Sequence, residues 1–225
     1  MVTPTRSRPA AFLDERERSL SQRAYDHLLD RLIRREIAVG AVLQERRLAE
    51  MLAISRTPVR DALNRLESEG LLTRKAGGIL VVTEFSTRDL IETLHVRQVL
   101  EMESVWLATG RIQTAELDAL ETDIRDLLTA EEPSSEDDWI IDSRFHGLIA
   151  ERSGNTVLAK HINDLRLKTH MFNMDRVPER FVIGHHEHLA VIDALRRGDR
   201  EQARAAIRAH LENVKLSIIE KLRSM

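Results

Sequence analysis

Hydrophobic positions in the first third of the chain recur at helical spacing and then form two short runs on either side of a Gly-Gly pair. Over residues 20–37 the apolar side chains share one helix face, which predicts an amphipathic helix. A short helix is predicted over 45–54, and a third over 55–69, where apolar residues recur at i, i+3, i+4 and i+7. The stretch LLTRKAGGILVVT then predicts two short strands, 71–74 and 79–83, around a Gly-Gly turn. Three helices followed by a β-hairpin are typical of a winged helix-turn-helix.

From Ser86 onward the pattern is helical, with no strand pattern and no internal repeat. Six helices are predicted, over 87–109, 113–130, 136–153, 155–170, 178–197 and 199–222. The first residues are rich in Pro, Arg and Ser and show no regular spacing. We therefore expect a mainly α protein with a flexible tail over 1–19, a winged helix-turn-helix domain with a small β-hairpin wing over 20–85, and an all-α helical bundle over 86–225.

Polar residues of the third predicted helix gather on the side opposite its apolar stripe. Arg56, Arg60 and Asn64 are spaced by four and face out together. A major groove admits one such helix, and the planar fork of arginine pairs with the guanine edge there. Ser55 and Thr57, at the helix start, can donate to phosphate oxygens. The alternative is a solvated charged face, but the order of the surrounding elements favours DNA binding.

Basic residues also flank this helix on both sides. Arg46 and Arg47, on the preceding helix, are placed to hold the DNA backbone. Arg74 and Lys75, in the predicted wing, are placed to reach a neighbouring phosphate. Taken together, these residues predict a basic surface that follows the DNA on either side of the groove.

The stretch LQERRLAEMLAISRTPVRDALNRLESEGLLTRKAGGILVV closely resembles the N-terminal winged-helix domain of the GntR family of bacterial transcriptional regulators. The resemblance implies that the following residues contact operator DNA: Arg46, Ser55, Arg56, Thr57 and Arg60. It also implies that the glycine-containing wing, with Gly77 and Gly78, enters the minor groove. The wing tip reads KAGGI, where many relatives carry an Arg or His beside the glycine.

Ligand-type residues interrupt the apolar stripes of three helices in the second part of the chain. In WIIDSRFHGLIA, Asp142 and His146 are four positions apart on the apolar stripe, and His188 and His210 lie on the stripes of the last two helices. Burying such groups without partners costs on the order of 1–3 kcal/mol each. Three imidazoles and one carboxylate suit a divalent ion such as Zn²⁺, Ni²⁺ or Mn²⁺. A six-coordinate ion would keep two positions open for water or a ligand.

A histidine on an apolar stripe is more often a core residue with one hydrogen bond, and the chain has nine His. His185 and His186 lie beside His188, and His185 also falls on the inward stripe, so periodicity alone leaves the ligand in GHHEHLAVI open. Histidines on different helices, together with the Asp/His pair at i and i+4, favour a metal site over the core interpretation.

Residues 87–222 resemble the all-helical ligand-binding domain of the FadR subfamily, the FCD domain. Its metal-binding members carry Asp-x-x-x-His on one helix, a His in an EHxxI context and a His on the last helix. The resemblance implies the following metal ligands: Asp142, His146, His188 and His210. It also implies that Arg97, in VRQVLE, binds the carboxylate of a small organic acid at the metal. From the residues alone, an intrahelical ion pair with Glu101 is equally compatible.

Charge and composition add to this picture. Residues 1–85 hold 15 Lys and Arg against 12 Asp and Glu, a net of +3, whereas residues 86–225 hold 19 against 25, a net of −6. Two domains with different partners fit this asymmetry. The absence of Cys excludes disulfides and thiolate chemistry and suits the cytoplasm. No apolar run approaches the ~20 residues of a membrane span, and no secretory signal is evident.

These features predict a cytoplasmic homodimer that binds a near-palindromic operator in double-stranded DNA and responds to a small carboxylate metabolite at a divalent metal site. Two alternatives remain open. One is a metal-dependent enzyme, for which Glu187 is a possible general base, although no second carboxylate is evidently placed for that role. The other is a regulator in which the metal is purely structural.

Overall fold

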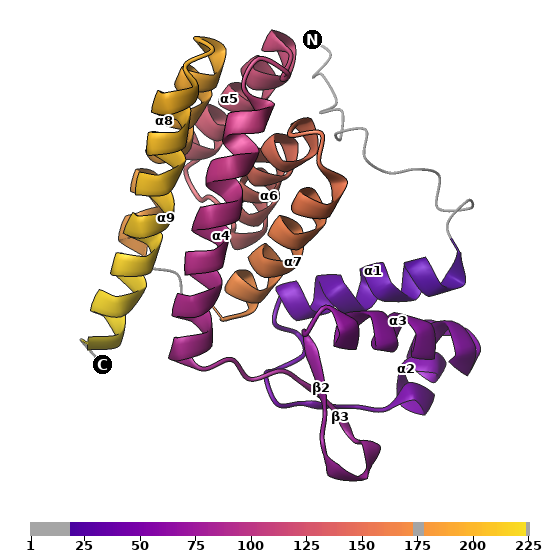
Figure 1. Cartoon of the computed structure of the whole chain (residues 1–225). Coiled ribbons are helices and arrows are strands. Elements are labelled where there is room, and N and C mark those ends of the chain that lie inside the picture. Colours follow the sequence, from indigo (N-terminus) through magenta and orange to yellow (C-terminus); the bar gives the residue numbers. More distant parts are fainter. Residues whose placement is uncertain (1–18, 173–177, 224–225) are drawn as a thin grey trace. The chain divides into compact units, whose positions relative to one another are not determined.

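The computed structural model describes residues 19–172 and 178–223 (Figure 1). Contacts between Cα atoms divide the chain into two units, Met1–Glu84 and Phe85–Met225. The tail predicted over 1–19 lies outside the described residues except for Ser19, whose hydroxyl accepts a hydrogen bond from Gln22 N and caps the first helix. The predicted fold class, mainly α with a small β wing, is confirmed.

The first unit contains three helices and a small antiparallel sheet. In chain order its elements are α1 (Leu20–Ile33), β1 (Val42–Leu43), α2 (Glu45–Leu52), α3 (Arg56–Ser68), β2 (Leu72–Arg74), the 3₁₀ turn η1 (Ala76–Gly78) and β3 (Leu80–Val82). The strand order is β1-β3-β2, with Val42 and Thr73 both opposite Val81. Helix α3 packs against α1, α2 and β2, and the β2–β3 hairpin extends away from the helices (Figure 1).

Two details of this unit differ from the prediction. The first helix ends at Ile33 and does not continue to residue 37, because Arg35 adopts a left-handed backbone with φ of 60° and Glu36 N instead donates back to Arg31 O. The predicted two-stranded hairpin is also joined by a third strand, β1. Its two residues are too few to show an alternating pattern, so pairing with β3 alone defines it.

The second unit is a bundle of six helices among the described residues. They are α4 (Thr87–Ala108), α5 (Thr114–Thr129), α6 (Ser135–Arg152), α7 (Thr156–Phe172), α8 (Pro178–Arg196) and α9 (Arg200–Arg223). All six predicted helices are therefore present, with ends that differ by at most two residues. Ser86 starts α4 with a reciprocal capping box, in which its hydroxyl accepts from Asp89 N and the Asp89 carboxylate accepts from Ser86 N.

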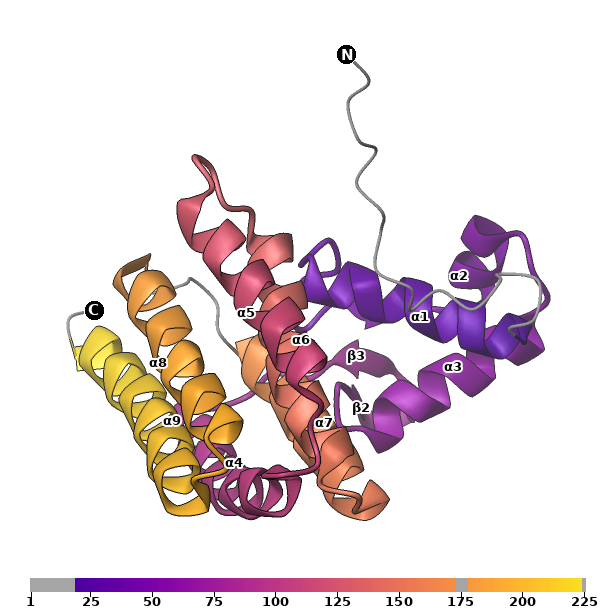
Figure 2. The ribbon, with the colours of Figure 1, turned by 90° about the horizontal axis from the view of Figure 1, so that it is seen from above.

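Helix α4 lies at the centre of this bundle and packs against α6, α7 and α9. Helix α8 lies beside α9 in both views and also packs on α5 (Figures 1 and 2). The main core cluster includes the fully buried Phe145 together with Val191, Ile192 and Ile207. This core fixes the inner faces of α6, α8 and α9, the three helices whose stripes carry the predicted metal ligands. Among the described residues, no helix combines the length and the apolar character needed to cross a membrane.

Candidate functional site

The exposed face of α3 begins at its N-terminal turn. Ser55 is the N-cap residue by backbone conformation, with φ of −70° and ψ of 163°, but its side chain makes no capping hydrogen bond. Pro58 and Val59 are buried, which turns Arg56, Thr57 and Arg60 outward. All ten residues predicted to bind DNA are exposed and lie in the first unit: Arg46, Arg47, Ser55, Arg56, Thr57, Arg60, Arg74, Lys75, Gly77 and Gly78. Their individual roles stay predictions.

Glu45, the first residue of α2, holds the two arginines of α3 together. Its carboxylate accepts hydrogen bonds from Arg60 Nε and Nη2, both at 3.1 Å, and from Arg56 Nη2 at 3.3 Å. Hydrogen bonding from Arg60 lowers the pKa of Glu45, so the carboxylate is charged at neutral pH. Glu45 was not predicted from the sequence, because the turn between α2 and α3, and not a helical repeat, brings it to the arginines.

The wing has an ion pair of its own. Arg74 Nε and Nη2 donate to the two carboxylate oxygens of Glu67, at 3.1 and 2.6 Å, and Nη1 donates to Gly78 O at 3.2 Å. Gly77 and Gly78 have φ of 77° and 78°, a left-handed conformation that glycine adopts without strain. The Gly-Gly pair thus permits the tight turn, and the carbonyl of Gly78 helps to orient Arg74.

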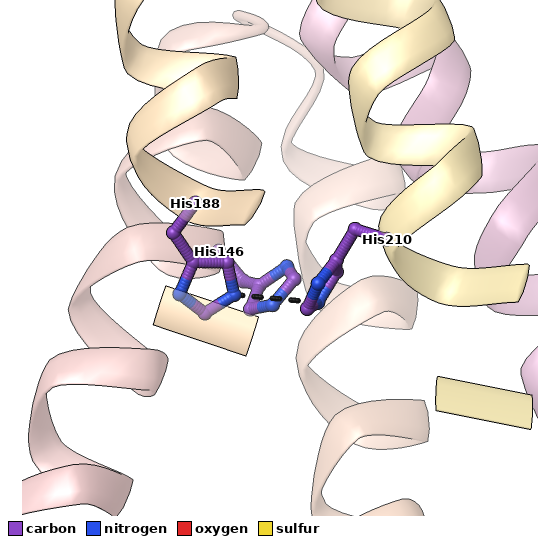
Figure 3. Close-up of side chains that lie close together, drawn as sticks. All are labelled: His146, His188 and His210. Atoms are coloured by element: carbon purple, nitrogen blue, oxygen red, sulfur yellow. Dashed lines mark hydrogen bonds between the residues drawn. The ribbon is translucent and has the colours of Figure 1, made fainter. Parts of the chain in front are cut away.

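Three histidines of the second unit meet inside the bundle. His146 on α6, His188 on α8 and His210 on α9 are only 2%, 2% and 4% exposed. Their rings converge (Figure 3), with one potential ligand atom of each within 4.8 Å of those of the others. The Nε2 atoms of His188 and His210 are 3.3 Å apart. Two neutral rings at this distance either share one hydrogen bond or offer both lone pairs to a cation.

Asp142 lies one turn before His146 and adds an oxygen to this cluster. Its Oδ1 is 3.5 Å from His146 Nε2 and 3.8 Å from His188 Nε2. Its Oδ2 accepts a hydrogen bond from the buried Arg166 on α7, at 2.5 Å. Burial raises the pKa of Asp142, but the Arg166 charge and the neighbouring histidines outweigh it and hold the pKa well below its usual value.

Carboxylates fix the outer nitrogens of two of the three rings. His146 Nδ1 donates to Glu101 Oε2 at 2.5 Å, and His210 Nδ1 donates to Glu187 Oε2 at 2.8 Å. Each bond places the proton on Nδ1 and leaves an Nε2 lone pair for the centre of the cluster. Ring stacking on Phe145, with centroids 4.0 Å apart, orients His188.

The electrostatics favour neutral rings at His188 and His210 beside ionised carboxylates. Burial lowers the pKa of His188 well below its usual value, and the neighbouring His210 lowers it further. Burial likewise lowers the pKa of His210. Burial raises the pKa of Glu101, but Arg97 and His146 outweigh it and the pKa falls. A cation site needs these protonation states, because a protonated imidazole cannot be a ligand.

The donor set fits a borderline divalent ion. Two nitrogens bound at about 2.0–2.1 Å to a tetrahedral ion lie about 3.3 Å from each other, close to the 3.3 Å between His188 Nε2 and His210 Nε2. Carboxylate-supported imidazoles with one ligating carboxylate are typical of Zn²⁺ and similar ions. His146, His188, His210 and Asp142 would hold such an ion; their role as ligands stays a prediction.

Periodicity left the histidine of GHHEHLAVI open, and the structure separates the three. His188 belongs to the cluster, whereas His186 is exposed. His185 is buried, but its Nδ1 donates to Phe181 O at 2.8 Å and it lies outside the three-histidine group. His185 is therefore a neighbour of the cluster.

Arg97 is buried and pairs with Glu101, with Nε donating at 2.8 Å. Glu101 also holds His146. The Arg97–Glu101 pair, which the sequence offered as the alternative to effector binding, therefore helps to position a histidine of the cluster. Arg97 does not line the cavity that opens beside the histidines. Its predicted contact with an effector stays a prediction.

A cavity of about 150 Å³ lies next to the cluster and reaches Asp142, His188 and His210. Arg180 and His185 of α8 line it as well. Arg180 and Arg166 were not predicted as site residues, since charged residues of a helix are ordinarily solvated. From the sequence, Glu187 was considered only as a possible general base. Its position next to His188 was the one indication that it lies at the cluster.

Comparisons with known proteins agree with this architecture. Residues 20–82 match the model of bacterial regulatory proteins of the gntR family, and residues 92–213 match the FCD domain. The Uxu operon regulator of Haemophilus influenzae is 30% identical over 78% of this chain and 73% of its own length. The Nta operon transcriptional regulator of Aminobacter aminovorans is 29% identical over 82% of this chain and 87% of its own.

Solved structures show the same fold. Escherichia coli McbR/YncC aligns with a TM-score of 0.79 and 25% identity, covering 91% of this chain and 99% of that one. The metal-free FCD domain of TM0439 aligns with a TM-score of 0.55 and 23% identity, covering 64% of this chain and all of that one.

A winged helix-turn-helix followed by an FCD domain defines a DNA-binding transcriptional regulator of the two-domain bacterial type. The chain belongs to the GntR family of bacterial transcriptional regulators, and its FCD domain is consistent with the FadR subfamily. The family resemblance inferred from the sequence is thus confirmed.

Proposed function

We propose that this regulator binds operator DNA through the exposed face of α3 and the wing, and that a metal ion with a small carboxylate ligand in the FCD domain modulates that binding. The observation that carries the proposal is the meeting of three buried histidines from α6, α8 and α9 with Asp142 beside a cavity. These ligand-type residues come from three different helices. Stability alone does not require such polar groups to meet at one point in the protein interior.

On the DNA side, the geometry supports α3 as the reading helix. Arg56 and Arg60 project from its first turns, where a recognition helix meets base edges. Arg74 and Lys75 in the wing and Arg46 on α2 are exposed and suited to phosphates. We propose a homodimer on a near-palindromic operator, because two-fold symmetric proteins read two-fold symmetric sites.

On the sensing side, the cavity supports an exchangeable ligand at the metal. A purely structural ion is normally closed off by its ligands, whereas His188, His210 and Asp142 all border the cavity. A carboxylate suits the remaining coordination positions of a hard or borderline ion. To act as a switch, the ligand must favour one arrangement of the regulator over another.

The base that the enzymatic alternative would use, Glu187, is already held by hydrogen bonds. Both oxygens of Glu187 accept hydrogen bonds from Arg180, and they also accept from His210 and Asn213. Those bonds hold the pKa of Glu187 at about 2 against the opposing effect of burial, so the carboxylate is a weak base. The named relatives are likewise regulators.

Native purification tests the sensing half of the proposal. The full chain is purified without chelators, its metal content is measured by elemental analysis, and bound acids are identified by mass spectrometry after denaturation. We expect about one divalent ion per chain and a small carboxylic acid released with it. A chain that takes up no ion even from metal-supplemented buffer contradicts the proposal, and turnover of ester or amide substrates by the loaded protein would favour the enzyme.

A further inference from the structure

The outward polar stripe of α3 continues past its two arginines to a carboxylate. Arg56, Arg60, Asn64 and Glu67 follow one another at a spacing of four, four and three, which places them on one helix face. The first three are exposed and Glu67 is partly exposed. A carboxylate at the end of a DNA-facing stripe is unfavourable by itself, because it repels the phosphate backbone. The partner of Glu67 therefore decides what this end of the stripe can do.

That partner is Arg74, at the base of the wing. Its Nε and Nη2 donate to Oε1 and Oε2 of Glu67, at 3.1 and 2.6 Å, and its Nη1 donates to Gly78 O at 3.2 Å. All three guanidinium nitrogens are thus bonded to the protein, including the Nε and Nη2 edge that could grip a phosphate in two parallel hydrogen bonds. Lys75, the next residue, is exposed and takes no part in these bonds.

The tip of the wing extends past the part of the hairpin that the hydrophobic core holds. Leu80, only 5% exposed, pairs with Arg74 in the last pair of the β2–β3 register. Residues 75–79 lie beyond this pair and are all exposed, and the hairpin points away from the helices (Figure 1). The tip contains the Gly-Gly turn, and glycine restricts the backbone less than any other residue. Arg74 connects this tip to α3, because it bonds both Gly78 O and Glu67.

We propose that Arg74 and Glu67 are positioning residues for DNA reading. Their ion pair holds the wing tip at a fixed angle to α3, so that α3 and Lys75 reach the same duplex together, and Arg74 makes no phosphate contact of its own. This inference rests on the proposed function. It takes Arg74 out of the set of phosphate contacts and leaves Lys75 as the basic side chain of the wing that meets the DNA backbone.

The geometry of the pair affects orientation more than stability. The side chains of Arg74 and Glu67 are 45% and 29% exposed, and an ion pair on the surface contributes little to the free energy of unfolding. An arginine and a carboxylate joined by two hydrogen bonds nevertheless have a fixed relative orientation. Breaking the pair should therefore leave the domain folded and release the tip. A released tip must be ordered when DNA binds, and this entropy cost lowers the affinity.

Exchanging the two charges distinguishes a positioning role from a phosphate contact. Arg74→Glu combined with Glu67→Arg keeps the net charge of the chain and allows the ion pair to form again. A positioning pair then regains its function, whereas a phosphate contact is replaced by a repelling carboxylate. Arg74→Gln combined with Glu67→Gln also keeps the net charge and serves as the broken pair. Affinity differences among these chains do not come from total charge.

Fluorescence anisotropy tests this with the full chain and an operator that the wild type selects from random duplex DNA. We expect the broken pair to bind about five- to thirtyfold more weakly, the loss of one charged contact at the wing. The exchanged pair should return to within about threefold of the wild type, with the wild-type slope of log affinity against log salt. Arg88→Glu combined with Glu92→Arg exchanges an exposed pair on α4 and is the matched control, for which we expect the wild-type affinity.

Hydroxyl-radical footprinting at saturating protein shows whether the wing itself is displaced. The DNA under the wing is defined as the positions that lose protection with Lys75→Gln. The broken pair should lose protection at these positions and keep it along the rest of the operator, and the exchanged pair should regain it. Thermal unfolding followed by circular dichroism should give the broken pair the wild-type midpoint, because the ion pair is exposed.

The inference is overturned if the broken pair binds the operator as tightly as the wild type, or if the exchanged pair binds no better than the broken pair. In the second case, a salt slope that is lower by about one assigns Arg74 to a phosphate. A broken pair whose unfolding midpoint falls together with its affinity has a structural role and overturns the positioning role. A wild-type chain that selects no operator is a different result, because it removes the proposed function itself.

Discussion

The DNA-reading face and the histidine cluster use hydrogen-bonded carboxylates in opposite environments. Arg60 and Glu45 meet on an exposed surface, where an ion pair contributes little and is easily exchanged for a phosphate or a base. His146 and Glu101 meet in the protein interior, with side chains 1% and 4% exposed, where a lost partner is not replaced by water. The exposed groups can change partners on binding, whereas the buried groups keep a fixed orientation.

Helix α4 contains the same contrast in a single element. Arg88 and Glu92 form an i, i+4 pair at 2.8 Å with side chains 86% and 61% exposed. Arg97 and Glu101 form the same pair at the same distance, with side chains 7% and 4% exposed. Spacing along the sequence is identical in the two cases, so burial, and not spacing, distinguishes the pair that lies against the histidine cluster.

The largest effect should follow loss of two cluster histidines. His146→Ala combined with His210→Ala removes two of the nitrogen ligands and should abolish stoichiometric metal binding, because a structural or catalytic ion needs at least three protein ligands. Elemental analysis after dialysis measures this. An unchanged metal content per chain would refute the assigned ligands.

The two arginines of α4 provide the next test. Arg97→Met leaves Glu101 as a buried charge with His146 as its remaining hydrogen-bond partner and should destabilise the FCD domain by about 3–5 kcal/mol. Urea unfolding followed by circular dichroism measures the change. Arg88→Met is the matched control, and its stability should equal that of the wild type within error. Equal losses of stability in both variants would show that burial does not determine how much such a pair contributes to the free energy of unfolding.

On the DNA-reading face, loss of a single arginine should lower DNA affinity by an amount that depends on the base sequence of the DNA. Arg56→Ala or Arg60→Ala should weaken binding to a selected operator about five- to a hundredfold and relax the base preference at one position. Fluorescence anisotropy with operator variants detects both changes. An equal loss on every sequence would instead assign that arginine to a phosphate.

The smallest effect is expected at Glu45. Glu45→Gln removes a negative charge beside Arg56 and Arg60 and should raise affinity for random duplex DNA about two- to threefold, with a steeper salt dependence. It should also lower the ratio of operator to random-DNA affinity, because the arginines lose the group that orients them. Glu92→Gln serves as a control of equal charge. Unchanged random-DNA binding by Glu45→Gln would contradict this role.

The sequence predicted the elements and placed each of the three histidines on an inward stripe, because both depend on spacing along one helix. His146 and Asp142 are on the same stripe by periodicity, and His188 and His210 are on stripes of their own. The left-handed Arg35 and the two-residue strand β1 were missed, because each depends on a single backbone conformation or pairing that leaves no repeating pattern.

The groups around the histidines were harder to predict for a related reason. Glu101, Arg166 and Glu187 meet the cluster from α4, α7 and α8, and only tertiary packing brings these helices together. Each of the three also looks like an ordinary charged surface residue in the sequence. Packing therefore buried the Arg97–Glu101 pair, which spacing had already offered, and placed Arg180 on the cavity, which spacing did not indicate.

The central claim is that an acid bound at the metal site of the FCD domain changes DNA binding by the winged helix. The most direct test is the affinity of the metal-loaded full chain for an operator selected from random DNA, measured with and without a panel of small carboxylic and hydroxycarboxylic acids. We predict that at least one acid changes the Kd about fivefold or more, and that the change is lost in the His146→Ala, His210→Ala variant. An operator Kd that is the same with every acid, or that responds equally in that variant, would contradict the claim.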